Sequence, residues 1–443
     1  MTVQSAMATL GPSRRWRNWG RTVEARPAAV ASPASPDEVA AVIRTARERG
    51  LPVKAVGAGH SFTAIAATDG VQLDISAIDG VLAVDGTRVR LGAGTNLYQL
   101  PALLAPHGLA LANMGDIDRQ TIAGATATGT HGTGLRFGGL ATQIRAATLV
   151  TASGDLLRVS ESENAELLPA VRIGLGALGI LVDVTIECVP AYLLHAVERG
   201  ERLDAVLDEW LDRVEAADHF EFYAFPHADG VSTKTNTRLP ADAERHPAHP
   251  VSNWIEEVLV QSGVIAAMCQ VSRVVPDVLP PLHRLATTLQ GNRDFTDASP
   301  AVFTSPRYTR FREMEYALPV EAVPDALRAV KRMIAERDLR IGYPIEVRAA
   351  AADDIWLSTA HGRRTGYIAV HHYFRQDPTR YFREVEAIMR SFDGRPHWGK
   401  MHVRDAGSLA AAYPRFADFL AVRDRLDPER VFRNDYLTRV LGV

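Results

Sequence analysis

The spacing of apolar residues predicts a regular series of strands and helices in the first half of the chain. Ser35 and Pro36 form a typical helix start, and apolar residues at helical spacing follow as far as Gly50, so a helix is predicted over 36–49. A second helix is predicted over 96–106. Alternating or continuous apolar runs predict strands over 51–56, 71–75, 81–84, 89–91, 144–151, 156–160 and 180–189.

The pattern changes after Pro190, where we place a domain boundary. Longer helical stretches follow, and no repeat of fixed period occurs. Strands and helices in mixed order favour an α+β fold. The expected helices cover 201–217, 251–269, 319–337 and 377–391, with a short one from Pro414, and the expected strands cover 219–225, 343–349 and 366–373.

Composition excludes several classes of function. The 443 residues include 49 Lys and Arg against 52 Asp and Glu, a net charge of −3, which does not favour broad binding to nucleic acid or to an anionic membrane. Two cysteines, Cys188 and Cys269, provide neither a disulfide framework nor a zinc site of four thiolates. No apolar run is long enough to span a membrane, and no secretory signal precedes the first helix. We therefore expect a cytoplasmic protein.

Three loops rich in small residues stand out, at 57–63, 121–134 and 174–180. We expect residues 124–134 to form a loop, because their side chains are too small to pack as a helix. The glycines of the third loop match the G-x-G-x-x-G pattern, but a strand follows them where a dinucleotide-binding turn needs a helix. The loops are either tight turns or, as we favour, a cradle in which small residues let the backbone approach one large nucleotide cofactor.

Ionisable residues gather later in the chain. Glu346 and Arg348 share one face of a predicted strand, while the apolar neighbours Ile345 and Val347 face the other way. This pair is either a surface ion pair of little consequence or part of a polar cleft, to which His371 and Lys400 would also contribute. The histidines lack acidic or cysteine partners at metal-ligand spacing, so we expect no metal.

Six motifs in a fixed order resemble those of the sugar-lactone and alditol oxidases in the vanillyl-alcohol-oxidase flavoprotein superfamily. Within that group the chain is most similar to L-gulono-1,4-lactone oxidases and dehydrogenases, and the resemblance extends over nearly its whole length. The motifs are Gly57-Ala58-Gly59-His60-Ser61-Phe62-Thr63, Ala127-Thr128-Gly129-Thr130-His131-Gly132-Thr133-Gly134, Gly176-Ala177-Leu178-Gly179, Glu346-Val347-Arg348, His397-Trp398-Gly399-Lys400 and Asn434-Asp435-Tyr436.

The resemblance implies a two-lobed PCMH-type FAD-binding domain over 21–190 after a lead-in over 1–20. An α/β cap domain would cover 191–393, and a C-terminal segment over 394–443 would return to complete the FAD site. His60 falls on the family's covalent flavin-attachment position. The other residues expected at the cofactor are Val56, Gly57, Ala58, Gly59, Ser61, Phe62, Gly115, Thr121, Gly124, Thr128, Gly129, Thr130, His131, Ile180 and His397.

The family's catalytic and substrate-binding residues correspond to Glu346, Arg348 and Lys400. Alditol oxidases carry a serine where Asp116 stands and a threonine where His371 stands, and these differences favour a lactone over an open polyol. The expected reaction is oxidation of an aldono-1,4-lactone by hydride transfer to the flavin. The alternatives are an alditol oxidase acting on xylitol or sorbitol and a flavin-bound carbohydrate-binding protein without turnover.

The identity of residue 115, a glycine, is relevant to which electron acceptor reoxidises the flavin. In this family a side chain at this position shields the flavin from oxygen, whereas glycine gives oxygen access. The resemblance therefore implies reoxidation by O2, with hydrogen peroxide as product, or by another electron acceptor.

Overall fold

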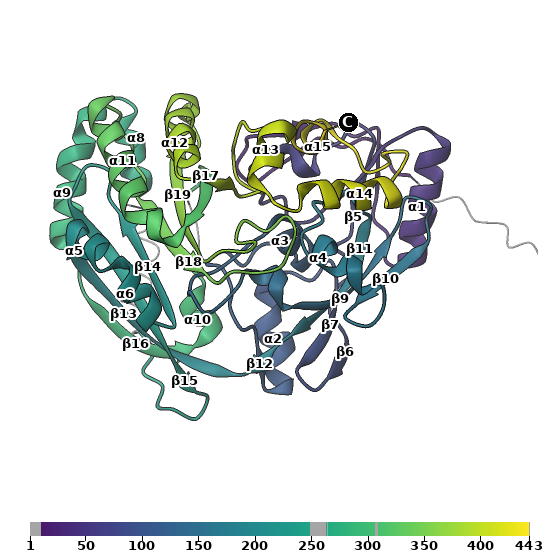
Figure 1. The fold of residues 1–443 in the computed structure, drawn as a ribbon, viewed down its shortest axis with the longest axis horizontal. Helices are drawn as coiled ribbons and strands as arrows, with labels where there is room; N and C mark the ends of the chain where they lie inside the picture. The colour runs from purple at the N-terminus through teal and green to yellow at the C-terminus, as the bar shows by residue number, and fades with distance from the viewer. Residues whose placement is uncertain (1–9, 249–262, 264, 306–308, 443) are drawn as a thin grey trace, which may run out of the picture.

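The computed structural model describes residues 10–248, 263, 265–305 and 309–442. Figure 1 shows two lobes side by side, with the C-terminal helices lying over the lobe that contains the N-terminal third of the chain. The helix expected over 251–269 falls mostly outside the described residues, and its end lies in helix α8 (Ile265–Ser272). Within the described ranges, no helix combines the length and apolar character that a membrane span requires.

The first lobe begins with a small parallel sheet in the order β3-β5-β4 (Ala29–Ala31, Val71–Asp74 and Val53–Val56). Helix α1 (Pro36–Glu48) connects β3 to β4 and starts as predicted, because the Ser35 side chain accepts a hydrogen bond from the backbone N–H of Glu38. Strand β4 ends at Val56, so the loop that contains His60 leaves directly from the sheet edge.

A five-stranded antiparallel sheet forms the rest of this lobe, in the order β10-β9-β11-β7-β6. The hairpin predicted at 144–160 is confirmed by the pairing of β9 with β10. The strands are β6 (Val81–Asp85), β7 (Arg88–Gly92), β9 (Ile144–Val150), β10 (Leu156–Ser160) and β11 (Ile180–Glu187), with short strands β1 (Trp16–Arg17), β2 (Glu24–Ala25), β8 (Leu109–Ala110) and β12 (Val189–Pro190) and helices α2 (Leu100–Leu104) and α4 (Leu168–Val171) around them.

The prediction of a loop throughout 124–134 is wrong, because helix α3 spans Ile122–Thr128. Thr121 caps its first turn through a hydrogen bond from the backbone N–H of Gly124, and Gly129 ends it in the left-handed conformation, with a φ angle of 85°. Alternate alanines favour the helix intrinsically, and burial against both sheets supplies the packing that small side chains alone were expected to lack.

The second lobe is built on one eight-stranded antiparallel sheet, in the order β16-β13-β15-β14-β18-β19-β17-β20. The strands are β13 (Tyr192–Arg202), β14 (His219–Ala224), β15 (Gly230–Pro240), β16 (Arg293–Ala298), β17 (Phe311–Pro319), β18 (Ile345–Ala350), β19 (Thr365–Tyr373) and β20 (Arg395–Pro396). The helices are α5 (Leu203–Asp208), α6 (Trp210–Ala216), α8, α9 (Leu279–Leu289), α10 (Ser299–Phe303), α11 (Val323–Glu336) and α12 (Thr379–Ser391).

The two faces of this sheet differ in character. Apolar residues of β14, β17, β18 and β19 pack with α5, α6, α11 and α12 in one core, which includes Phe222, Tyr316 and Val347. Because side chains alternate along a strand, the residues between them point to the opposite face. That face carries Glu221, Tyr223, Glu313, Glu315, Glu346, Arg348, Tyr367 and His371.

The chain returns to the first lobe after β20. Helices α13 (Ala406–Ala412), α14 (Phe416–Leu426) and α15 (Asp435–Leu441) pack into the core of that lobe (yellow in Figure 1). The Asn434 side chain donates hydrogen bonds to the carbonyls of Ala64, Ile65 and Ala67, just after the His60 loop. The last segment therefore helps to fix the loop that the sequence assigns to the cofactor.

Candidate active site

A deep cleft in the first lobe is lined by all three of the loops rich in small residues. It has a volume of about 1000 Å³, open solvent at its mouth included. The lining includes Gly57 to Ser61 after β4, Thr121 to Thr128 along α3, and Gly174 to Leu181 before and within β11. The interpretation of these loops as one cradle, instead of three unrelated turns, agrees with this arrangement.

The cleft is shaped for close approach of a ligand to the backbone. A Cβ atom at Gly57 would overlap the Thr121 side chain, and Gly59 and Gly176 have positive φ angles of 69° and 59°. Lys54 and His60 are the only lining residues, among those the structure describes, with an ionisable side chain. A mostly uncharged cleft of this volume, lined by three loops and including a histidine, fits FAD, whose length requires contacts with several loops.

The predicted cofactor residues divide into two groups in the structure. Gly57, Ala58, Gly59, His60, Ser61, Thr121, Gly124, Thr128 and Ile180 line the cleft. Val56, Phe62, Gly115, Gly129, Thr130, His131 and His397 lie behind it or towards the second lobe.

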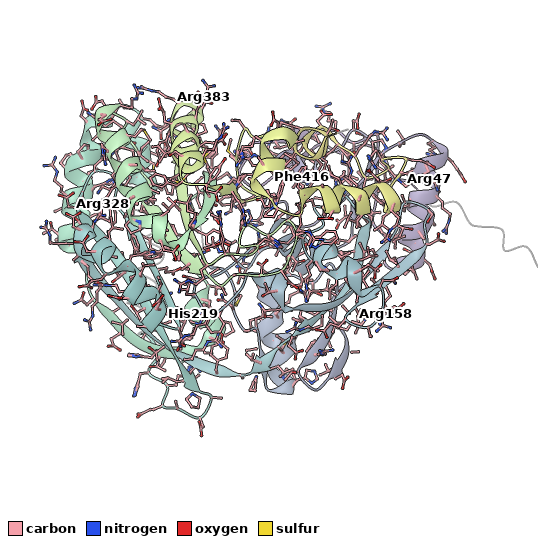
Figure 2. The ribbon with its side chains drawn as sticks, viewed as in Figure 1. Arg47, Arg158, His219, Arg328, Arg383 and Phe416 are labelled. Carbon is pink, nitrogen blue, oxygen red and sulfur yellow. The ribbon has the colours of Figure 1, made fainter. Side chains whose placement is uncertain are left out.

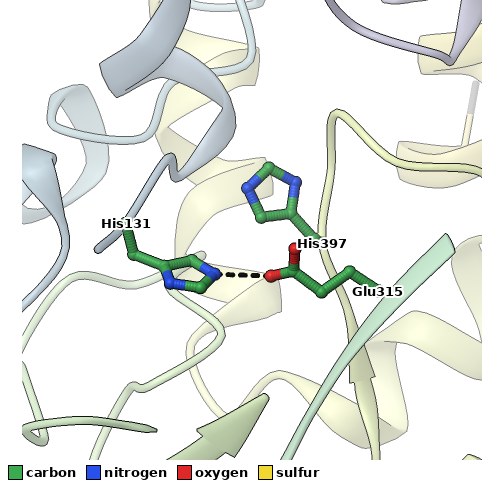
Figure 3. A group of neighbouring side chains, drawn as sticks. All are labelled: His131, Glu315 and His397. Carbon is green, nitrogen blue, oxygen red and sulfur yellow. Dashed lines mark hydrogen bonds and ion pairs between the residues drawn. The ribbon is translucent and has the colours of Figure 1, made fainter. Parts of the chain in front are cut away.

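Two of the predicted histidines, His131 and His397, lie near Glu315 of the eight-stranded sheet, and His131 forms a hydrogen bond with it (Figure 3). His131 Nε2 lies 2.5 Å from Glu315, and its Nδ1 donates to the Gly132 carbonyl. His397 Nδ1 accepts a hydrogen bond from the backbone N–H of Gly399, and burial lowers the pKa of His397 to about 3. Although ligand atoms of the three side chains lie within 4.8 Å of one another, the contacts they already make join the two lobes without an ion.

Arg348 is the centre of a buried group of charges on the polar face of the cap sheet. Its guanidinium donates to Glu221 at 2.8 Å, pairs with Glu346 on its own strand, and lies 3.5 Å from Asp116 of the first lobe. Arg348 is only 8% exposed. Three carboxylates around one cation leave this part of the site with an excess of negative charge.

That excess changes the protonation of Glu346. Its pKa is raised to about 8: burial is the largest cause, Arg348 opposes the shift, and the nearby carboxylates of Asp116, Glu221 and Glu313 add to it. The hydroxyl of Tyr223 donates to Glu346 at 3.1 Å. Glu346 is therefore a carboxyl group whose proton is exchangeable near neutral pH, as a general acid or base requires.

Lys400 brings a second cation to the same region. It pairs with Glu313, and its ammonium group lies 5.4 Å from the centre of the Phe62 ring. Burial alone would lower the pKa of Lys400, but the carboxylates of Glu313 and Glu315 outweigh it and the pKa is raised. Lys400 is thus a cation at any physiological pH.

His371 lies between the two carboxylates that flank these cations. Its Nε2 is 3.7 Å from Glu313 and 4.0 Å from Glu346, while its Nδ1 is 3.2 Å from the Pro344 carbonyl. The structure therefore brings together all five residues predicted for catalysis and substrate binding: Asp116, Glu346, Arg348, His371 and Lys400.

Sequence reasoning missed the carboxylates that hold these cations. Glu313 and Glu315 lie on β17, which was not predicted, and Glu221 lies on β14, which was predicted without a role for its charge. The segment Phe311–Pro319 places Glu313 and Glu315 two residues apart, on either side of the apolar Met314. That pattern has the same period as Glu346 and Arg348 and is typical of a strand with one polar, buried face.

This group of charged residues, referred to below as the pocket, approaches the His60 loop through Lys400, which lies over the Phe62 ring. Positive charge from Lys400 and Arg119 adds to burial in lowering the pKa of His60 to about 4. The imidazole of His60 is therefore neutral at physiological pH. A neutral histidine on the lining of a nucleotide-sized cleft, close to the cation of Lys400, can serve a reaction in which the cofactor becomes more negative.

Comparisons with known proteins agree with this geometry. A family model described as D-arabinono-1,4-lactone oxidase matches residues 184–440, and a model described as FAD binding domain matches residues 27–160. The predicted α+β fold is confirmed by a cholesterol oxidase from Brevibacterium sterolicum, with a TM-score of 0.80, 18% identity, and coverage of 98% of this chain and 97% of that one. That likeness concerns the fold alone.

Three relatives match almost end to end. An L-gulono-1,4-lactone dehydrogenase of Mycobacterium tuberculosis is 44% identical over 96% of this chain and 99% of its own length. An L-gulonolactone oxidase of Bos taurus and an alditol oxidase of a Streptomyces species are each 34% identical, over 96% of this chain and 98% of their own lengths. The resemblance inferred from the motifs is thus confirmed, and the chain belongs to the D-arabinono-1,4-lactone oxidase family of FAD-dependent oxidoreductases, in the vanillyl-alcohol-oxidase superfamily.

Proposed function

We propose that this FAD-dependent oxidoreductase oxidises an aldono-1,4-lactone of the L-gulono-1,4-lactone type at C2. The observation that carries the proposal is the buried array of Glu346, Arg348 and Lys400 next to the His60 end of the cleft. The names of relatives with 44% and 34% identity, a lactone dehydrogenase and a lactone oxidase, support the same substrate class.

FAD, held along the cleft, would supply the acceptor for the hydride that leaves the alcohol carbon. Arg348 and Lys400 would bind the oxygens of the substrate and stabilise the negative charge that develops in the reaction. Arg348 is buried and Lys400 is half-buried, and each is held by a carboxylate, so their orientation is fixed before substrate arrives.

Glu346 is the residue in this array best suited to take the hydroxyl proton. Its pKa of about 8 matches the working range, and Arg348 and Tyr223 fix the orientation of its carboxyl group. Glu221 and Glu313 would act as positioning residues, because they hold Arg348 and Lys400 in place from β14 and β17.

Asp116 and His371 would favour a lactone over an alditol. Both bring hydrogen-bonding groups to the pocket at positions where the resemblance implies a serine and a threonine in alditol oxidases. A ring with a carbonyl and several hydroxyls offers partners for both, whereas a flexible polyol loses more conformational entropy on binding.

We also propose that His60 attaches the flavin covalently. The neutral imidazole has an unprotonated nitrogen for bond formation, and His60 lies on the lining of the cleft. The bond is tested by acid precipitation. The yellow colour should remain with the protein precipitate of the wild type and pass into the supernatant for His60→Ala, and free flavin in both samples would contradict the attachment.

For reoxidation we propose O2, giving hydrogen peroxide, or another acceptor. Gly115 lies against the His131 carbonyl, and a Cβ there would stand 3.0 Å from that oxygen. A methyl group would therefore occupy the narrow space that glycine leaves. Gly115→Ala should slow reoxidation in air and leave reduction by substrate unchanged, and equal slowing of both steps would contradict this role.

The substrate is tested by anaerobic mixing of the yellow protein with L-gulono-1,4-lactone and, separately, with xylitol. The proposal predicts rapid bleaching of the flavin by the lactone alone. Bleaching by xylitol alone would assign the chain to the alditol oxidases, the second candidate, which a 34% identical relative supports. A flavin that neither compound bleaches would contradict both.

A further inference from the structure

Three arginine side chains surround one phenylalanine near His60. The guanidinium carbons of Arg21, Arg310 and Arg375 lie 5.8, 5.5 and 5.3 Å from the centre of the Phe374 ring. Arg21 and Arg375 are exposed, and Arg310 is half-buried. Together with Trp19, which Arg310 also contacts at 5.6 Å, these residues form the arginine patch.

The positive charge of the patch is not balanced by neighbouring carboxylates. Within residues 10–248, 263, 265–305 and 309–442, none forms an ion pair with Arg21, Arg310 or Arg375. The Nε of Arg310 is buried without a hydrogen-bond partner. Contact with one aromatic ring stabilises an exposed cation only weakly, and it leaves the positive charge of the three guanidinium groups uncompensated.

The Trp19 ring of the patch also contacts His60, the residue predicted to attach the flavin. The Trp19 ring stacks on His60 with centroids 5.5 Å apart and planes 19° from parallel. Trp19 also contacts Phe62 and Phe311 edge-on, so its position is fixed by packing. The half-buried Trp19 ring would therefore provide a short path for electron transfer from a flavin at His60 to an acceptor on the positively charged surface.

We propose that the arginine patch is the docking site for a negatively charged electron acceptor, reduced through Trp19 and His60. The proposal rests on the proposed function, since it needs a flavin at His60. Oxidation of one alcohol to a carbonyl releases two electrons and two protons. Two one-electron acceptors, each gaining one electron, complete the turnover, and the protons pass to solvent. Such an acceptor need not enter the substrate pocket.

The test uses two small acceptors of opposite charge. Flavin in the purified protein is reduced without air by one equivalent of dithionite, so the result does not depend on the substrate. Its reoxidation by ferricyanide, a trivalent anion, is then followed by rapid mixing, and in parallel its reoxidation by hexaammineruthenium(III), a trivalent cation. Each rate is compared with that of the same acceptor in the wild type.

The variant is Arg21→Gln/Arg310→Gln/Arg375→Gln, which removes the charges of the patch. The control, Arg49→Gln/Arg158→Gln/Arg433→Gln, removes the same number of arginines from elsewhere, all three exposed, and one of them lies on β10 of the first lobe (Arg158 in Figure 2). The exposed single variant Arg375→Gln keeps the test valid should the triple variant fail to fold.

We expect the rate constant for ferricyanide to fall ~10-fold or more in the patch variant and to lose most of its dependence on ionic strength. The rate for hexaammineruthenium(III) should rise, and the control should leave both rates within about twofold of the wild type, as expected of charges beyond the Debye length. A ferricyanide rate equal to that of the control would overturn the proposal, as would equal loss with both acceptors. A colourless protein would instead contradict the proposed function itself.

Discussion

The cleft proposed for the cofactor and the pocket proposed for the substrate lie close together near His60, yet they differ in the kind of residue that forms them. The cleft is lined mainly by small and apolar residues from three separate loops, with Lys54 and His60 as its only ionisable side chains among the described residues. The pocket is a set of buried charges from β14, β17, β18 and the C-terminal segment, each held by a partner from another element. On this account the cleft would recognise its ligand mainly by shape, and the pocket would recognise its ligand mainly by charge.

The difference has a functional meaning. A cofactor that stays bound needs many close contacts and little change in charge. A reacting alcohol needs cations and a proton acceptor that are already oriented when it arrives. Substitutions should therefore separate the two sites, with changes in the cleft affecting flavin content and changes in the pocket affecting the rate per bound flavin.

The largest effect is expected at Arg348. Arg348→Lys keeps the charge but loses the fixed geometry that reaches Glu221, Glu346 and Asp116 together, so anaerobic flavin reduction by the lactone should slow ~10²–10³-fold. Arg172→Lys is the matched control, because Arg172 is also buried and ion-paired but lies outside the pocket. Equal slowing in both variants would show that the loss reflects folding and not chemistry.

Gly57→Ala should weaken flavin binding about 10-fold or more, since a Cβ there overlaps the Thr121 side chain and overpacking of this kind costs ~1–3 kcal/mol. Flavin per protein after gel filtration measures the effect. Gly407→Ala is the control, because a Cβ at Gly407 meets only Asp405, at 3.9 Å. Full flavin content in Gly57→Ala would contradict the close-approach argument.

Glu346 should make the reaction depend on pH. Since the carboxylate form accepts the proton and the pKa is about 8, reduction should accelerate ~10-fold per pH unit below 8 and level off above it. Glu346→Gln should be slow and independent of pH in this range. An unchanged pH profile in Glu346→Gln would assign the ionisation to another group.

The same shift opposes folding as the pH rises from 4.5 to about 8, because the folded protein retains a proton there that the unfolded chain releases. The melting temperature of Glu346→Gln should consequently fall less than that of the wild type across this interval. Thermal unfolding at several pH values provides the measurement.

The smallest effect is expected at Glu313, which contacts Lys400 and not the substrate itself. Glu313→Gln keeps the shape and a hydrogen-bond acceptor but removes the charge that holds Lys400, so reduction should slow ~10-fold and substrate affinity should change little. Glu313→Asp should recover part of the rate. An effect as large as that of Arg348→Lys would mean that Glu313 reacts directly.

The same contrast explains what the sequence could predict. The cleft residues from Gly57 to Ser61 are neighbours in the chain, so a short stretch of sequence is enough to recognise their motif. Glu221 and Glu313 contact Arg348 and Lys400 only because β14, β17 and β18 lie in one sheet. Their local sequence does not indicate these partners. Helix α3 was missed because burial between two sheets stabilises alanine-rich residues that look loop-like on their own.

The most direct test measures flavin per protein and reduction rate per bound flavin side by side, in Gly57→Ala and in Arg348→Lys. The account predicts that Gly57→Ala loses flavin while the flavin that remains is reduced at nearly the wild-type rate. Arg348→Lys should keep its flavin and lose the rate. If both variants lost flavin content and reduction rate together, this result would contradict the claim that the cleft binds the flavin and the pocket supports the chemistry.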